Sequence, residues 1–116
     1  MNPQSYDRRF FLPGTPPVDE FPTSGGTQTT DALGVNFMRG RKTVQIAEKT
    51  SSAITANIKI MGRARKDMPY AQVGSTITAT GFYGFDEDLA DVKLEITGHS
   101  AGIILAALSG WNEEHG

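Results

Sequence analysis

Apolar residues recur at every second position through much of the chain after residue 43. In the clearest run, the even positions of 54–61 are apolar: Ile54, Ala56, Ile58 and Ile60. The same alternation is found at 43–47 and 91–97. Successive side chains of a β-strand point to opposite faces, so this spacing predicts strands with one face in a core and the other in water. No helix of three turns is needed to explain the sequence.

The segment 103–108 is apolar on both faces, and a helix and a buried strand both fit it. Because it soon ends at Ser109 and Gly110 and its neighbours already form strands, we interpret it as a central strand. Such a strand needs cover on both faces, which we expect from the N-terminal segment or from a second subunit. The preceding stretch Gly98–Gly102 is interpreted as the turn of a β-hairpin.

Residues 1–42 have a different character. They contain five of the six prolines and no sustained period, so they read as an extended arm. Apolar residues spaced along the arm suit contacts with a neighbouring surface. The expected partner-binding anchors are Tyr6, Phe10, Phe11, Leu12, Phe21 and Phe37. The alternative is that these anchors cover the chain's own body.

The predicted fold is therefore all-β, a small antiparallel β-sandwich of jelly-roll-like type with a long extended N-terminal arm. Its expected divisions are the arm (1–42), a sandwich body (43–111) that folds without the arm, and a C-terminal tail (112–116). Within the body, 70–73 is expected to be a short strand and 77–83 a strand with a bulge at Gly81.

The pentapeptide Gly98–Gly102 also matches the G-x-S-x-G nucleophile elbow of hydrolases, with Ser100 as the nucleophile. That chemistry needs an acid and a histidine later in the chain. After Ser100 the chain supplies only Glu113, Glu114 and His115, which are adjacent and cannot easily form a relay to one serine. We therefore expect no enzyme and no catalytic residue, with an esterase as a remote alternative.

Clustered charges offer other sites. The carboxylates at 86–91 do not have the spacing of a calcium-binding loop and are expected to form a solvated turn. The basic clusters 39–42 and 63–66 could pair with phosphates or with the acidic turn of another copy. His99 and His115 have no second ligand at metal spacing. No metal site and no cofactor is expected.

Composition limits the kinds of partner that the chain is expected to bind. The net charge is −2 with both signs interspersed, so no direct contact with nucleic acid is expected. There is no cysteine, which excludes disulfides and thiol chemistry. The first residues lack the apolar run of a signal peptide, and no apolar stretch of the sequence is long enough to cross a membrane. We expect neither a membrane contact nor a small-molecule substrate.

The body, mainly its last third, resembles a small β-sandwich module of tailed-phage structural proteins. The resemblance lies in the charge-alternating strand 91–97, the Gly/Ser turn, and the apolar strand that closes on Leu108-Ser109-Gly110-Trp111. The segment 77–83 has a similar rhythm. No invariant functional residue is carried over.

This resemblance implies a non-enzymatic virion structural protein, made in the host cytoplasm. The expected role is a capsid decoration or cement subunit whose arm binds other virion proteins, above all the major capsid protein, and copies of itself. The alternative is a tail, collar or fibre-associated module that recognises a receptor or glycan through four aromatic residues: Phe82, Tyr83, Phe85 and Trp111.

Overall fold

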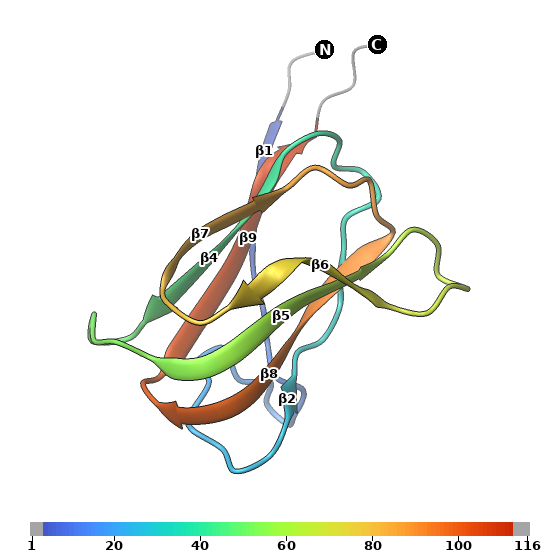
Figure 1. The fold of residues 1–116 in the computed structure, drawn as a ribbon. Coiled ribbons are helices and arrows are strands. Elements are labelled where there is room, and N and C mark those ends of the chain that lie inside the picture. The colour runs from blue at the N-terminus through green and yellow to red at the C-terminus, as the bar shows by residue number, and fades with distance from the viewer. Residues whose placement is uncertain (1–3, 113–116) are drawn as a thin grey trace.

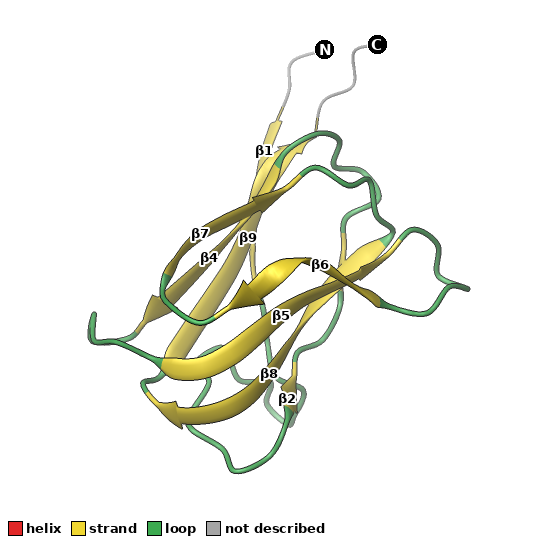
Figure 2. Ribbon diagram, viewed as in Figure 1, coloured by secondary structure: helices red, strands yellow, loops and turns green. Residues whose placement is uncertain are grey.

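The computed structural model describes residues 4–112, which form nine strands and contain no helix (Figures 1 and 2). In chain order the strands are β1 Gln4–Arg9, β2 Gln28–Thr29, β3 Leu33–Gly34, β4 Lys42–Glu48, β5 Thr55–Arg63, β6 Ala71–Ile77, β7 Gly81–Phe85, β8 Asp91–Ala101 and β9 Ile104–Asn112. In this range no helix is long and apolar enough to cross a membrane.

The strands form two sheets that face each other (Figure 1). One sheet has the order β1-β9-β4-β7, and the other has the order β2-β8-β5-β6 with β3 also paired to β8. Every pairing is antiparallel. The prediction of a small antiparallel β-sandwich is confirmed.

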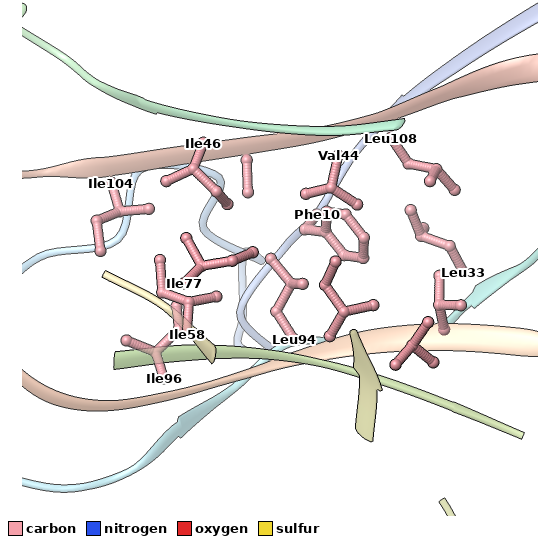
Figure 3. Packing of buried hydrophobic residues seen from close by; sticks show 14 of the residues in the cluster. Phe10, Leu33, Val44, Ile46, Ile58, Ile77, Leu94, Ile96, Ile104 and Leu108 are labelled. Atoms are coloured by element: carbon pink, nitrogen blue, oxygen red, sulfur yellow. The ribbon is translucent and has the colours of Figure 1, made fainter. Parts of the chain in front are cut away.

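The core lies between the two sheets and is built from the alternating apolar positions (Figure 3). Val44 and Ile46 of β4 point inward from one sheet, and Ile58 of β5 and Leu94 of β8 meet them from the other. The residues between these positions face outward, as a period of two requires. The strands predicted at 43–47, 54–61 and 91–97 therefore have the expected inner faces.

The N-terminal segment is part of both sheets. Strand β1 pairs with β9, while β2 and β3 pair with β8. Phe10 and Phe21 are fully buried, and the backbone of Phe21 forms a bridge with Ile104. The boundary expected at residue 42 is not a boundary of the fold, and the arm is not separate from the body. The physical reason is that Phe10, Phe21, Val35 and Met38 fill the same core as the body's strands.

The β-hairpin predicted at Gly98–Gly102 is wrong. Strands β8 and β9 belong to different sheets, so the chain crosses from one sheet to the other at this point. Gly98, with φ at +61°, lies in the part of β8 where the register with β5 is irregular. Gly102, with φ at +87°, lies at the crossing itself. Glycine takes these left-handed conformations without the steric cost that a side chain imposes.

The single strand predicted at 77–83 is also wrong. Strand β6 ends at Ile77 in one sheet, and β7 begins at Gly81 in the other. Residues typical of strands lie on both sides of this break, and the alternation of side chains continues across it. Alternation alone therefore does not reveal that the chain changes sheets here. Strand β9, by contrast, is central as predicted, with β1 on one side and β4 on the other.

Candidate interaction surface

The outer face of the sheet β1-β9-β4-β7 carries the largest exposed aromatic side chains. The strand registers place side chains of β4, β9, β7 and β1 together on this face: Thr43, Gln45, Ala47, Leu105, Ala107, Ser109, Phe82, Asp7 and Arg9. Phe82 is 72% exposed, and Trp111, near the opposite end of the face, is 53% exposed. Between them lie several small side chains: Thr43, Ala47, Ala107 and Ser109.

The end of this face near Phe82 is mainly apolar. We call Gln45, Ala47, Phe82, Leu105 and Ala107 the Phe82 patch. Two hollows of about 300 and 260 Å³ share Gln45 and Ala47, and together they include every member of the patch. Leu105 and Ala107 are only half-buried. The inner face of β9 is covered by the opposite sheet together with Phe10 and Phe21 of the N-terminal segment. The outer face is partly open to water, so the prediction of cover on both faces is wrong for the chain by itself.

The end near Trp111 is polar. A hollow of about 370 Å³ is lined by backbone and side chains of all three adjoining strands and of the residue before β4: Tyr6, Asp7, Arg41, Thr43, Ser109, Gly110 and Trp111. It joins an exposed indole with a carboxylate and two hydroxyl groups. We call this the Trp111 hollow.

The six predicted anchors do not form one surface. Phe10 and Phe21 belong to the core, so their assignment to partner contacts is corrected in favour of the alternative that they cover their own body. Tyr6, Leu12 and Phe37 pack partly buried against the same core, with the Tyr6 and Phe37 rings 4.3 Å apart at their centroids. Phe11 is the one of the six that stays exposed.

The four aromatic residues of the receptor-binding alternative do not lie on one surface either. Phe85 is buried, and Tyr83 points inward on the same face of β7, with its hydroxyl donating to the Ala79 carbonyl at 2.6 Å. Only Phe82 and Trp111 are available to a ligand. The split follows from the alternation of strand side chains, because Phe82 is the neighbour of Tyr83 and faces the other way.

Ser100 lies near the end of β8, exposed and outside any strand-to-helix turn. The adjacent His99 is buried, with Nδ1 2.8 Å from Gln28 Oε1 and Nε2 2.5 Å from the Gly102 carbonyl. Both ring nitrogens thus serve to hold the β8–β9 crossing. The other residues considered for a relay, Glu113, Glu114 and His115, lie outside the described residues.

Glu48 holds the same crossing from the other side. Its Oε1 accepts hydrogen bonds from the Thr50 and Ser52 amides, both at 2.8 Å, and from the Thr50 hydroxyl at 2.7 Å. Its Oε2 accepts from the Ile103 amide at 2.9 Å. These donors, with Ile103 the largest cause, lower the pKa of Glu48 from 4.5 to about 2. The carboxylate is structural because its oxygens are occupied.

The acidic turn pairs with basic residues of its own chain. Asp86 lies 3.5 Å from Arg41, and Asp88 lies 3.9 Å from the buried Lys42. Burial lowers the pKa of Lys42, while Asp88, Asp86 and Glu87 act in the opposite direction. The sequence had left open a pairing with another copy, and the structure supplies an internal one.

A second charged cluster stabilises the other sheet. Arg63 forms a bidentate ion pair with Asp91 at 2.9 and 3.1 Å, and the Tyr70 hydroxyl donates to Asp91 at 2.7 Å. Burial alone would raise the pKa of Asp91, but the hydrogen bonds from Arg63 and Tyr70 outweigh it and lower that pKa. The cations of Arg63 and Lys93 lie 4.5 and 4.1 Å from the centroid of the Tyr70 ring. This cluster joins β5, β8 and the 63–70 loop.

Within residues 4–112 no group of three or more His, Asp or Glu side chains is arranged to hold a metal ion. The features that sequence reasoning missed, Glu48 and the two ends of the outer face, depend on strand register. The one available signal was Glu48 itself, an acidic residue at an inward position of an alternating strand.

No family model and no curated protein matches the sequence. Among solved structures, the chain is similar to the crystal structure of SPBc2 prophage-derived protein YomS. The two share 16% sequence identity, and the match has a TM-score of 0.68 and covers 96% of each chain. At this identity the likeness establishes the fold: the sandwich, including its N-terminal segment, is an arrangement that a second and very different sequence also adopts.

Proposed function

We propose that this chain is a non-enzymatic structural protein of a bacteriophage particle. The observation that carries the proposal is the fold match with a prophage-derived protein over 96% of both chains. The resemblance of the body, mainly its last third, to tailed-phage sandwich modules points the same way. The non-enzymatic part is supported by the place of the elbow sequence, since Ser100 lies within β8 and a strand follows it, whereas a nucleophile elbow needs a strand-to-helix turn.

Within the particle, the proposed role is a capsid decoration or cement subunit that binds the major capsid protein and copies of itself. The docking surface is the Phe82 patch. An exposed phenylalanine beside hollows that Ala47, Leu105 and Ala107 help to line suits an interface anchor, because buried aromatic residues contribute much of the binding energy of protein interfaces. This surface replaces the arm as the part of the chain that contacts neighbours.

The experiment compares particles assembled with two variants, Phe82→Asp and Met68→Asp. Met68 is the matched control, since it is 50% exposed in the loop between β5 and β6, on the other sheet. Copy number per particle is measured by quantitative mass spectrometry of purified virions, and neighbours are identified by cross-linking. We expect Phe82→Asp to lower the copy number at least about tenfold, a loss typical of an interface hot spot.

Met68→Asp is expected to incorporate as the wild type does, and cross-links are expected to reach the major capsid protein. Wild-type protein that is abundant in the lysate but missing from particles would refute the structural role. Normal incorporation of Phe82→Asp would refute the docking surface, and cross-links confined to tail or fibre proteins would favour the tail-associated alternative.

A further inference from the structure

The Trp111 hollow lies where three neighbouring strands align their polar side chains. Ser109 of β9 is in register with Asp7 of β1 on one side and with Thr43 of β4 on the other. Paired residues of adjacent strands point to the same face and lie about 4.8 Å apart between strands. The three side chains therefore form a row across the outer face of the sheet (Figure 1 shows β1, β9 and β4 side by side).

Trp111 follows Ser109 by two positions, so its indole stands on the same face beside this row. It is 53% exposed, and the hollow beside it has a volume of about 370 Å³. Arg41 also lines the hollow, while its guanidinium lies 3.5 Å from Asp86. The result is an aromatic surface next to two hydroxyls and a carboxylate.

We propose that the Trp111 hollow binds a neutral hexopyranose unit of a saccharide. A pyranose ring has an apolar C–H face, which stacks on an indole, and a rim of hydroxyl groups that both donate and accept hydrogen bonds. Asp7 accepts hydrogen bonds from sugar hydroxyls, and the hydroxyls of Thr43 and Ser109 donate or accept. The volume of the hollow lies in the ordinary range of small-molecule sites.

The charges favour a neutral sugar over an acidic one. Arg41 already lies 3.5 Å from Asp86. Asp7 has no ion pair among residues 4–112, so a sugar carboxylate beside it would meet a group of like charge that is not engaged by a cation. This inference is independent of the proposed virion role, since the Phe82 patch lies at the other end of the face.

Trp111 is the single tryptophan of the chain, so its fluorescence reports on the hollow directly. The full chain is titrated with the methyl pyranosides of glucose, galactose, mannose and N-acetylglucosamine, and with glucuronic acid. We expect at least one neutral glycoside to change the emission with a dissociation constant of about 0.1–10 mM, as suits one stacked ring and a few hydrogen bonds. Glucuronic acid is expected to bind at least about tenfold more weakly than the best neutral glycoside.

The variants are measured by calorimetry against the best neutral glycoside. Trp111→Ala is expected to weaken binding at least about tenfold and Asp7→Asn about fivefold, while Met68→Ala, which removes an exposed apolar side chain on the other sheet, stays within about twofold of wild type. Thermal unfolding confirms that each variant folds. The proposal is overturned if none of the four neutral glycosides binds, if glucuronic acid binds best, or if binding survives both Trp111→Ala and Asp7→Asn.

Discussion

The carboxylate of Glu48 accepts hydrogen bonds from the 50–52 turn and from Ile103, the residue before β9. It thereby joins the end of β4 to the crossing between the two sheets. On the other side of the crossing, His99 contacts Gly102 and Gln28. These two inward-facing polar residues, and not the serine between the glycines, give the Gly98–Gly102 pentapeptide its structural role.

Replacing Glu48 by Gln puts an NH₂ group among donors that need an acceptor. We expect the melting temperature to fall by several degrees at neutral pH, because backbone amides lose a charged acceptor. The pKa of Glu48 is depressed from 4.5 to about 2 in the folded protein, so its stabilisation is complete above pH 4.5 and is lost as the pH falls towards 2. The difference between wild type and variant should shrink over that interval.

Thermal melts across this pH range make the comparison. The control is Glu87→Gln, in the exposed acidic turn, which is expected to change the melting temperature less at every pH. Equal stability of wild type and Glu48→Gln at neutral pH would mean that the four hydrogen bonds to Glu48 contribute nothing.

At the scale of elements, the N-terminal segment contributes one edge strand, two short strands and several core side chains. Strand β1 covers the edge of β9, and β2 and β3 cover the edge of β8. Without residues 1–42, both strands would expose unpaired backbone groups and the core would lose Phe10 and Phe21. The segment is therefore needed for folding, and the body is not expected to fold without it.

Adjacent phenylalanines test this role within one segment. Phe10 is fully buried and Phe11 is 37% exposed. We expect Phe10→Ala to lower the free energy of unfolding by about 3–5 kcal/mol, as for other buried aromatic residues. Phe11→Ala should change it by no more than about 0.5 kcal/mol. Urea denaturation followed by circular dichroism measures both, and similar effects at the two positions would contradict the placement of Phe10 in the core.

For the whole molecule, strands from both ends of the chain lie in the same sheet and one core connects both sheets. Such an arrangement is expected to unfold as one cooperative unit. The N-terminal amides that bond to β8 and β9 should then be as protected as the body itself. They include the amides of Phe10, Phe21 and Thr30, which donate to Ala106, Ile104 and Leu94.

Hydrogen exchange measured by NMR checks this cooperativity. We expect the three N-terminal amides to exchange at rates comparable to those of the central residues of β9, since their opening requires global unfolding. Exchange that is fast in 10–30 and slow in β9 would instead describe a detachable arm on a stable body.

The sequence by itself determined the all-β class and most strand faces, because a period of two in apolar residues is a local property that survives any arrangement of strands. Val44, Ile58 and Leu94 lie inward as their spacing predicts. The irregular segment 1–42 gave no such signal, so local pattern could not tell anchors for a partner from anchors for the chain's own core.

Only the tertiary structure decided which strands pair, and with them every candidate site. Residues far apart in the sequence come together at the place where Phe10 is buried and in the row formed by Asp7, Ser109 and Thr43. The crossing at Gly98–Gly102 likewise depends on which strands share a sheet. Alternation says which side of a strand faces the core. It does not say which strand is its neighbour, because that depends on long-range packing and register.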